Sequence, residues 1–594
     1  MTQRFVQLPT DTERSAASEF EAASSASRQL DLPGVPGDAE LLGAIVALLH
    51  RYTQQATISV DVFIREGTAE RKLRRLAVDL AVEHDAPVSS VIQRAQAALA
   101  GSNDGPVSNV AVSLDVRPGV AWAPASYDAH FALARTGEKP LLAISYNARL
   151  LRESTIHRLV DSCVVLMEAA SRDPATAVER LPLLSPAELR ALTVEQDSGT
   201  ASYPPLPIHR LFQAMAKRQP EAVAASFQGQ RITYAELDAR SSQVAHHLVT
   251  SGVGPEVPVA VCVRPSLHVL VAMLGIWKAR GIYLPLDPTH PETLIGRMLD
   301  EAQPRLVLTT SDFIPLTARF PQLCFDTDAG ARLLANQPAG APENAPSFGD
   351  PAYLFYTSGT TGKPKGVVAT QGNLAHYIHA AARKYGFSPA DVFVSMARYT
   401  FSISLWELLS PLCCGGSLRI LERDDVLTPE RLFRALEEVT VLHAGPSLLG
   451  SLFRHLRPQS RTLPRMRHAS SGGDLVPPAV MEEMKRVFPG AELFVIYGCT
   501  EISCMGTTYP IRRDVTAGRT FVGKPFPDVT VRVLDPNRGL VPFGAVGEIC
   551  FAGEGITRGY LGRPDLTAEK FVELEGRRFY LTGDMGRLHP DGNL

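Results

Sequence analysis

The chain has 594 residues, too many for one ordinary hydrophobic core, and at roughly 150 residues per unit it predicts three or four packed units. Hydrophobic residues make up 45% and charged residues 20% of a sequence whose formal net charge is −3, which is typical of a folded globular protein. No global basic excess would attract nucleic acid or an anionic membrane, so we expect neither as a partner.

Targeting and redox signals are weak along this sequence. Residues 1–20 contain no apolar run, and the most apolar stretch, HVLVAMLGIW, stops at Lys278 and is too short to span a bilayer. We therefore expect a cytoplasmic protein. The 8 cysteines are scattered, and the adjacent pair Cys413 and Cys414 lacks the spacing of a metal or redox motif. We interpret them as reduced thiols, mostly in the core.

Residues 1–180 have the pattern of a mixed α/β unit. Helical apolar spacing runs through 38–52 and again through 154–170, whereas 56–64 and 109–116 have the composition of strands. Between 172 and 206 proline and serine accumulate, which predicts a short helix followed by an extended linker. We place the domain boundary there, with the linker at 181–206.

The remainder, 207–594, changes pattern once. Up to about residue 505, short β-rich runs alternate with helical segments, as in VPVAVCV, PSLHVLVAMLGIWKAR, IYLPLD and PRLVLTT. This alternation predicts βαβ units and largely parallel sheets covered by helices, an α/β fold. After about 520, strands separated by turn residues predict a smaller antiparallel β unit.

The stretch FYTSGTTGKPKG, at 355–366, combines three glycines, hydroxyl side chains and two lysines. Glycines let backbone N–H groups turn toward a phosphate chain, hydroxyls add neutral donors and lysines add charge, so the loop suits ATP better than it suits a plain surface turn. Its spacing is not that of G-x-x-x-x-G-K-[ST]. The one match to that pattern, from Gly518, has Pro525 at the metal-binding hydroxyl position and is treated as chance.

A series of motifs in fixed order resembles the adenylate-forming enzymes, and within them the adenylation domains of nonribosomal peptide synthetases. The resemblance implies a core of two parallel-sheet α/β subdomains, up to about residue 505, and a small β-barrel over about 506–594. The proline-rich form GIYLPLDP points to the peptide-synthetase branch rather than to acyl-CoA ligases or luciferases. The motifs are ITYAELDARS (232–241), WKARGIYLPLDP (277–288), YTSGTTGKPKG (356–366), TFSISLWE (400–407), SSGGDL (470–475), IYGCTE (496–501), GEICFAGEGITRGYLGRP (547–564) and YLTGD (580–584).

In this family a carboxylic acid attacks the α-phosphorus of ATP, pyrophosphate leaves, and the acyl-adenylate passes to the phosphopantetheine thiol of a carrier protein. The resemblance implies that Thr500 contacts the α-phosphate, Glu501 ligates Mg²⁺, Tyr497 stacks on adenine and Asp584 binds the ribose hydroxyls. The backbone from Gly472 through Gly473 to Asp474 would face the adenine edge. The mobile phosphate loop would be lined by Thr357, Ser358, Thr360, Thr361, Lys363 and Lys365.

The sequence departs from the family pattern at two places, Cys499 and the C-terminal end, and each leads to an expectation about the site. Cys499 stands where proline is usual, which is expected to loosen a turn but to leave its functional neighbours in place. The sequence ends at HPDGNL, before the small lid whose lysine contacts the substrate carboxylate in the family. We expect residues 1–594 to bind ATP and substrate but to form adenylate slowly, if at all, when tested alone.

Ser402 occupies the position at which peptide-synthetase domains normally carry the aspartate that pairs with the substrate ammonium. Losing that partner costs on the order of 3–5 kcal/mol, whereas one hydroxyl hydrogen bond returns about 1 kcal/mol. Two substrates fit: a small polar amino acid whose amine is held elsewhere, or a hydroxy, keto, β-amino or aryl acid without an α-ammonium. The implied pocket is Ser402, Ile403, Trp406, His443, Ser470, Gly472, Ile496, Cys504 and Met505.

The N-terminal 180 residues resemble the C-terminal lobe of a condensation domain, which normally precedes an adenylation domain. Condensation needs an H-H-x-x-x-D-G motif, and no His-His pair occurs before residue 200. We therefore interpret this part as a noncatalytic lobe that docks on the adenylation core or recruits another protein. A stand-alone acyl-CoA or aryl acid ligase and a noncatalytic docking scaffold are the alternatives. The sequence leaves open whether an MbtH-like protein binds.

Overall fold

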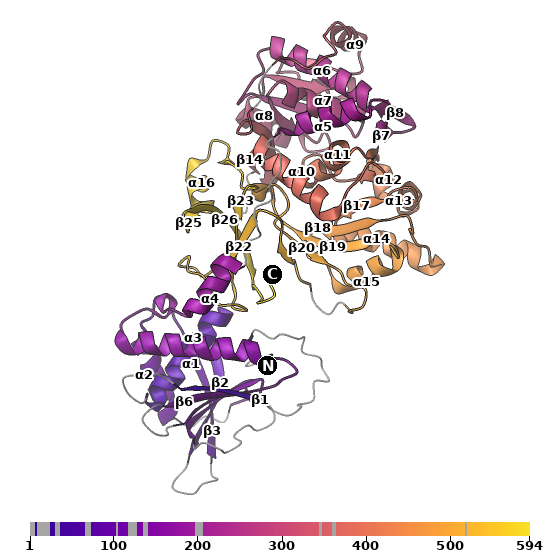
Figure 1. The fold of residues 1–594 in the computed structure, drawn as a ribbon. Helices are drawn as coiled ribbons and strands as arrows, with labels where there is room; N and C mark the ends of the chain where they lie inside the picture. Colours follow the sequence, from indigo (N-terminus) through magenta and orange to yellow (C-terminus); the bar gives the residue numbers. More distant parts are fainter. Residues whose placement is uncertain are drawn as a thin grey trace.

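A computed structural model describes residues 6–8, 24–29, 36–65, 73–101, 105–116, 127–134, 140–195, 206–343, 347–358, 364–516 and 520–594. The protein is mixed α/β and elongated (Figure 1). The N-terminal lobe lies at one end, a small four-stranded sheet lies in the middle, and two larger sheets with their helices lie beyond it.

The N-terminal lobe is a six-stranded sheet in the order β1-β6-β5-β4-β2-β3. Helices α1 (Asp38–Thr53) and α3 (Glu153–Arg172) pack on it, and these helices, β2 and β4 agree with the elements predicted from the sequence. The apolar face of α1 is buried along nearly its whole length, which anchors the lobe. The other elements are β1 (Ser24–Gln29), β2 (Thr57–Arg65), β3 (Leu73–Ala81), α2 (Val88–Ala100), β4 (Val110–Val116), β5 (Ala129–Ala134) and β6 (Leu141–Tyr146).

A seven-stranded sheet begins the core, in the order β12-β11-β9-β10-β13-β14-β24. Its central strands β9 to β11 are short and almost entirely buried, as expected for parallel strands covered by helices on both faces. Its strands are β9 (Pro258–Cys262), β10 (Ile282–Pro285), β11 (Leu306–Thr309), β12 (Gln322–Cys324), β13 (Pro351–Ser358), β14 (Pro364–Thr370) and β24 (Gly559–Tyr560). The helices of this part are α5 (Ile208–Arg218), α6 (Tyr234–Thr250), α7 (Leu267–Lys278), α8 (Glu292–Ala302) and α9 (Asp328–Ala335).

A nine-stranded sheet follows, in the order β21-β20-β19-β18-β17-β15-β16-β7-β8. Strands β15 to β19 run parallel, so their carboxyl ends meet at one edge. Its strands are β7 (Val223–Phe227), β8 (Gln230–Thr233), β15 (Val392–Ser395), β16 (Ser417–Ile420), β17 (Val441–Ala444), β18 (His468–Gly472), β19 (Glu492–Tyr497), β20 (Thr507–Pro510) and β21 (Lys524–Pro525). Its helices are α10 (Gln371–Tyr385), α11 (Ile403–Cys414), α12 (Arg423–Leu427), α13 (Pro429–Leu436), α14 (Pro446–Leu456) and α15 (Pro478–Val487).

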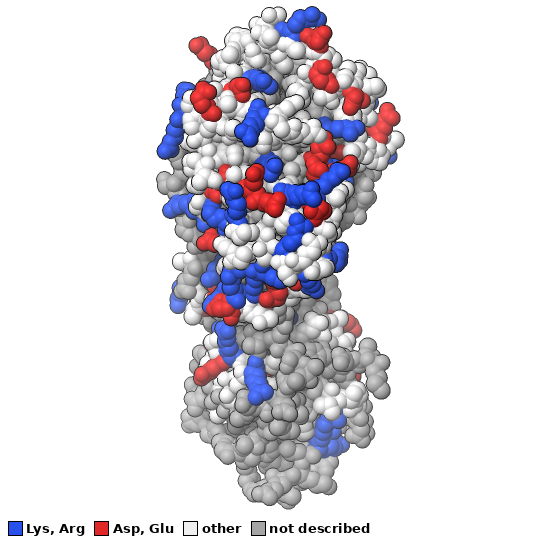
Figure 2. All heavy atoms as spheres, turned by 90° about the vertical axis from the view of Figure 1, so that its right-hand side faces the viewer, with Lys and Arg blue, Asp and Glu red and all other residues white. Residues whose placement is uncertain are grey.

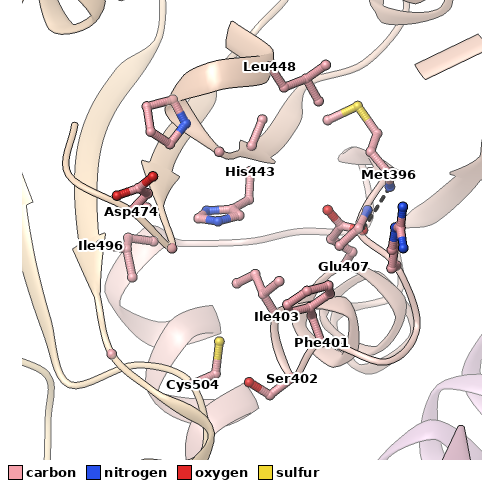
Figure 3. Close-up of a pocket in the computed structure, with 18 of the residues that line it drawn as sticks. Met396, Phe401, Ser402, Ile403, Glu407, His443, Leu448, Asp474, Ile496 and Cys504 are labelled. Atoms are coloured by element: carbon pink, nitrogen blue, oxygen red, sulfur yellow. Dashed lines mark hydrogen bonds between the residues drawn. The ribbon is translucent and has the colours of Figure 1, made fainter. Parts of the chain in front are cut away.

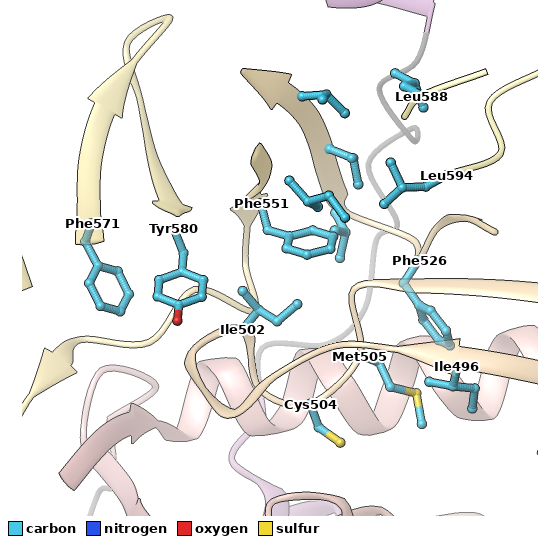
Figure 4. Packing of buried hydrophobic residues seen from close by; sticks show 14 of the residues in the cluster. Ile496, Ile502, Cys504, Met505, Phe526, Phe551, Phe571, Tyr580, Leu588 and Leu594 are labelled. Atoms are coloured by element: carbon cyan, nitrogen blue, oxygen red, sulfur yellow. The ribbon is translucent and has the colours of Figure 1, made fainter. Parts of the chain in front are cut away.

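The last sheet is four-stranded and antiparallel, formed by β22 (Val529–Leu534), β23 (Gly547–Gly553), β25 (Phe571–Leu574) and β26 (Arg577–Gly586), with α16 (Pro564–Lys570) beside it. Its apolar side chains face the end of the nine-stranded sheet (Figure 4). Phe551 and Tyr580 lie beside Ile502, which belongs to the short turn η6 (Thr500–Ile502). The small sheet therefore supports that turn.

The N-terminal lobe contacts the four-stranded sheet through buried polar groups. Arg51 of α1 donates to Asp535 Oδ2 at 2.9 Å and to the carbonyl oxygens of Val178 and Leu181, each at 2.8 Å. Both side chains of the ion pair are about 5% exposed. The Val546 amide donates to the Tyr52 carbonyl oxygen of the lobe, and the Phe543 amide donates to Glu188 in the adjoining linker, so docking involves the backbone as well.

Replacing Arg51 with methionine is expected to weaken this docking by ~3 kcal/mol, because Asp535 is left as an uncompensated buried charge. Hydrogen exchange at the Phe543 and Val546 amides should then become faster. The control is Arg172→Met, which removes an exposed ion pair with Glu168 and should cost well under about 1 kcal/mol. Equal exchange rates in the two variants would contradict the prediction.

On the face shown in Figure 2, basic and acidic side chains are interspersed over the core. None of the helices in the described ranges is both long and apolar enough to cross a membrane.

Candidate active site

A cavity of about 480 Å³ opens where the carboxyl ends of β17, β18 and β19 meet the start of α11 (Figure 3). Ligand sites of open α/β sheets commonly lie at this edge. The predicted residues that line the cavity are Ser402, Ile403, His443, Gly472, Gly473, Asp474, Ile496, Thr500 and Cys504. Residues from three motifs that are far apart in the sequence, together with His443 and Cys504, therefore line one cavity.

Two glycines let the strands of this edge approach closely. A Cβ at Gly472 would collide with the carbonyl oxygen of Ile496, its partner on β19, and a Cβ at Gly498 would collide with the carbonyl oxygen of Cys504. Gly473, just after β18, has φ +79°, a conformation that favours glycine. The shape of the cavity therefore depends on glycine where β18 and β19 end.

Tyr497 and Asp584, which were predicted to hold adenine and ribose, touch each other. The Tyr497 hydroxyl donates to Asp584 Oδ2 at 2.6 Å, across 87 positions of sequence. Burial and the neighbouring carboxylate raise the pKa of Tyr497. The Tyr497 ring lies 5.9 Å from that of Phe551, which supports it from the small sheet. The two residues thus come together from β19 and β26.

Glu501 is buried at the turn η6, with 5% exposure. Its Oε1 accepts a hydrogen bond from the Tyr560 hydroxyl at 2.9 Å. Lys365 Nζ lies 4.8 Å from the centroid of the same tyrosine ring. Tyr560, which was not singled out from the sequence, therefore links the predicted metal ligand to the lysine of β14.

The hydroxyl-and-lysine loop is only partly described. Thr357, next to the end of β13, has a buried Oγ1 with no hydrogen-bond partner among the described residues, so a donor or acceptor from a ligand would satisfy it. Ser358 is described for its backbone alone, as the strand end paired with Pro364. Thr360, Thr361 and Lys363 lie outside the described residues.

The donor set around Glu501 fits Mg²⁺ delivered with a nucleotide. Within the described ranges, no group of three or more His, Cys, Asp or Glu side chains could hold a metal by itself. Mg²⁺ is usually bound through one or two carboxylates together with substrate phosphates and water. The buried carboxylate of Glu501, near the hydroxyl-and-lysine loop at 355–366, matches that requirement.

At the other end of the cavity, Ser402 and Thr500 share a hydrogen bond of 3.2 Å between their hydroxyl oxygens. Ser402 is the N-cap of α11 and is 8% exposed. The Cys504 thiol lies beside it, and burial raises the pKa of that thiol to about 11. These three side chains form a neutral wall of two hydroxyls and a thiol.

His443 projects from β17 toward the centre of the cavity (Figure 3). Its Nδ1 shares a hydrogen bond of 3.0 Å with Ser470 Oγ. Burial lowers the pKa of His443 to about 4, so the ring is neutral near pH 7. It offers a hydrogen bond rather than a charge.

Trp406 lies behind His443, with ring centroids 6.0 Å apart, and packs against Phe387 and Phe393. Of the predicted pocket residues, all of which the structure describes, Trp406, Ser470 and Met505 do not line the cavity. Met505 lies in the apolar cluster beneath η6 (Figure 4). These three side chains support the wall rather than form its surface.

Glu407 lines the cavity, although no role was predicted for it from the sequence. It is 1% exposed, and its Oε2 accepts backbone N–H groups of Met396 at 2.8 Å and Ala397 at 3.0 Å. Burial raises its pKa to about 8, although these N–H donors and the Ser395 hydroxyl oppose the shift. Its sequence signals were its place as the last residue of the motif TFSISLWE and its place four residues after Ile403, on the same helical face.

Comparisons with known proteins agree with this architecture. Over 471 residues the chain is 34% identical to a dimodular nonribosomal peptide synthase of Bacillus subtilis (strain 168), covering 76% of this chain and 20% of the relative. It is 30% identical to chondramide synthase cmdD of Chondromyces crocatus, and the match covers 99% of this chain and 17% of that relative. The chain thus spans about a fifth or less of the length of these two curated relatives.

Solved structures share the fold. A four-domain nonribosomal peptide synthetase, holo-AB3403 bound to AMP and glycine, has a TM-score of 0.83 at 19% identity, covering 99% of this chain and 49% of that one. The N-terminal subdomain of Klebsiella oxytoca NpsA, in complex with 3-hydroxybenzoyl-AMSN, has a TM-score of 0.59 at 27% identity. The match covers 66% of this chain and 99% of that one.

The family model described as "AMP-binding enzyme" matches residues 212–561, more than half of the chain. This range contains the cavity, the paired strands β13 and β14 that flank the hydroxyl-and-lysine loop, and the turn η6 that bears Glu501. The protein therefore belongs to the AMP-binding enzymes, and its core is an adenylation domain of the nonribosomal peptide synthetase type.

Proposed function

We propose that this chain activates a small carboxylic acid as an acyl-adenylate for transfer to a carrier-protein thiol in nonribosomal peptide synthesis. The observation that carries the proposal is the hydrogen bond between Ser402 and Thr500, because it joins the acid end of the cavity to the turn that bears Glu501. A small polar amino acid or an amino-acid-like acid is the first candidate substrate.

In this proposal a carboxylate oxygen of the acid attacks the α-phosphorus of ATP. The bond from that phosphorus to the bridging oxygen breaks, and pyrophosphate leaves with the electron pair. Tyr497 and Asp584 hold the nucleoside, and Thr500 orients the α-phosphate. Catalysis is then mainly charge stabilisation and positioning. The loop residues that would hold the phosphates are Thr357, Ser358, Thr360, Thr361, Lys363 and Lys365.

Mg²⁺ bound by Glu501 and phosphate oxygens would supply positive charge where negative charge develops on the leaving group. The carboxylate is already positioned, since Tyr560 fixes its Oε1. Lys365, over the ring of the same tyrosine, would add a second positive charge.

The proposed partners follow from the same chemistry. A peptidyl carrier protein would present its phosphopantetheine thiol to the acyl-adenylate, and residues 1–180 would act as a noncatalytic lobe docked through Arg51 and Asp535. The match of chondramide synthase over 99% of the chain supports treating the lobe and the core as parts of one module. An MbtH-like protein is a further partner to test.

A stand-alone aryl acid ligase is the second candidate. Two N-terminal subdomain structures of NpsA, 26% and 27% identical to this chain, are described with 3-hydroxyanthranilyl-AMSN and 3-hydroxybenzoyl-AMSN. Neither acyl group has an amine on the carbon next to the carboxyl group. The buried docking of the N-terminal lobe favours the peptide-synthetase module over this alternative.

Calorimetry with Mg²⁺ and a non-hydrolysable ATP analogue tests the proposal on residues 1–594. We expect saturable binding that Tyr497→Ala weakens and that Tyr509→Ala, on neighbouring β20, leaves unchanged. Acid-dependent ATP–pyrophosphate exchange should follow with one class of acid. Absence of nucleotide binding would refute the proposal.

A further inference from the structure

A second cavity, of about 720 Å³, lies near the outer edge of the nine-stranded sheet, between the β7–β8 hairpin and helices α12 and α13 (Figure 1). Its described lining residues do not overlap with those of the cavity at Ser402. Arginines outnumber acids in its lining, and we call it the arginine groove. The arginines are Arg231, Arg419, Arg431, Arg434 and Arg465, and the acids are Glu422, Asp425 and Glu438.

Strand register places two of the arginines in one row on the floor of the groove. Arg419 of β16 pairs with Ser226 of β7, and Ser226 pairs in turn with Arg231 of β8. Residues directly opposite one another on neighbouring strands project from the same face of a sheet. Because neighbouring strands lie ~4.8 Å apart, the two arginines start from backbone positions ~10 Å apart, with a hydroxyl group between them.

Two of the three acids are already engaged at the margin of the groove. Glu438 Oε2 is 3.6 Å from Arg419 Nη1, and Asp425 Oδ1 is 3.6 Å from Arg431 Nη1. Arg419 also donates to the Ala435 carbonyl oxygen at 2.9 Å, which holds its side chain beside α13. Each of these acids therefore offsets one arginine and leaves the others uncompensated.

The remaining charges of the groove do not balance. Arg231 and Arg465 are exposed, and neither forms an ion pair with any residue that the structure describes. Arg434 pairs with Glu430, which is not among the lining residues. Glu422 alone is left to offset Arg231 and Arg465. Because a concave surface with an excess of one charge concentrates ions of the opposite charge, the groove favours an anion.

The residue types and their spacing indicate which anion fits. A guanidinium group binds phosphate oxygens through two parallel N–H donors, and the Ser226 hydroxyl adds a neutral donor between Arg419 and Arg231. Two arginines that start ~10 Å apart can hold the two ends of one anion. A chain of two or three phosphates offers charged oxygens at both ends, which a single phosphate does not.

We propose that the arginine groove is a second anion site, which binds a polyphosphate chain, free or as part of a nucleotide, without a metal ion. The guanidinium groups supply the positive charge that Mg²⁺ would supply beside Glu501. Pyrophosphate, the leaving group of the proposed reaction, belongs to this class of ligand, but the groove takes no part in that reaction.

Calorimetry with tripolyphosphate in the presence of EDTA tests the inference on residues 1–594. We expect saturable binding that Arg231→Ala and Arg465→Ala each weaken at least about tenfold, because each removes a charge-assisted hydrogen bond. Arg454→Ala is the matched control, since Arg454 is an exposed arginine of neighbouring α14 that does not line the groove. Arg454→Ala and Lys365→Ala should leave the affinity unchanged.

A further comparison separates the two sources of a polyphosphate chain. Tripolyphosphate and a non-hydrolysable ATP analogue are titrated without Mg²⁺ into Tyr497→Ala, in which the nucleotide cavity is weakened. Equal affinities assign the groove to the polyphosphate chain itself, and tighter binding of the analogue assigns it to a nucleotide. Either result supports the site if Arg231→Ala in the same background weakens the binding.

Three results would overturn the inference. One is the absence of metal-free tripolyphosphate binding. Another is binding that Lys365→Ala abolishes and Arg231→Ala spares, which would place the anion at the phosphate loop. The third is tighter binding of a tetraglutamate peptide than of tripolyphosphate, which would assign the groove to an acidic protein segment. None of them affects the proposed function, which is tested by nucleotide binding with Mg²⁺.

Discussion

Glu501→Gln is expected to lower the rate of adenylate formation by about a hundredfold or more, the range seen when one group that stabilises the transition state is removed. The amide oxygen can still accept the Tyr560 hydroxyl, so the turn should keep its position. What the variant loses is the negative charge that would hold Mg²⁺ beside the phosphates. The defect should therefore concern metal-dependent steps rather than folding.

Acid-dependent ATP–pyrophosphate exchange measures the rate, and calorimetry with and without Mg²⁺ measures the metal contribution to ATP affinity. The variant should bind ATP with little dependence on Mg²⁺. Glu492→Gln is the matched control, because Glu492 is exposed at the far end of β19. Exchange at the wild-type rate in Glu501→Gln would remove Glu501 from the proposed mechanism.

Glu407→Gln is expected to become more stable than wild type as the pH rises from about 5 to about 8. The unfolded carboxyl group ionises near its ordinary pKa of 4.5, whereas the folded one holds its proton until about pH 8 because it is buried. In that interval the folded state binds more protons than the unfolded state, so raising the pH destabilises the wild-type fold. The amide does not titrate.

The difference should reach roughly 4 kcal/mol at the upper end, since the folded and unfolded pKa values are about 8 and 4.5 and one pKa unit corresponds to about 1.4 kcal/mol. Urea denaturation at several pH values measures it. The glutamine Oε1 can accept the Met396 and Ala397 amides, which keeps the geometry comparable. Glu437→Gln, at an exposed position after α13, should show no such trend. A difference that does not change with pH would contradict the buried, protonated state.

Much of the architecture followed from the sequence. Short apolar runs alternating with helical spacing predicted the parallel sheets, because buried parallel strands need apolar side chains on both faces. The resemblance carried by the ordered motifs implied a nucleotide-dependent enzyme, and the residue types of the loop at 355–366 independently suited ATP. The neutral residue at position 402 was visible in the same way.

Only the tertiary structure decided which side chains reach the cavity. Trp406 and Glu407 are adjacent on α11, yet the tryptophan packs behind His443 and the glutamate lines the wall, since successive helical positions differ by about 100°. Likewise, Tyr497 and Asp584 meet across two sheets. Local sequence patterns determine the residue types of the site and the helical or strand periodicity. Long-range packing determines which way each side chain points, how deeply it is buried and which charges surround a bound acid.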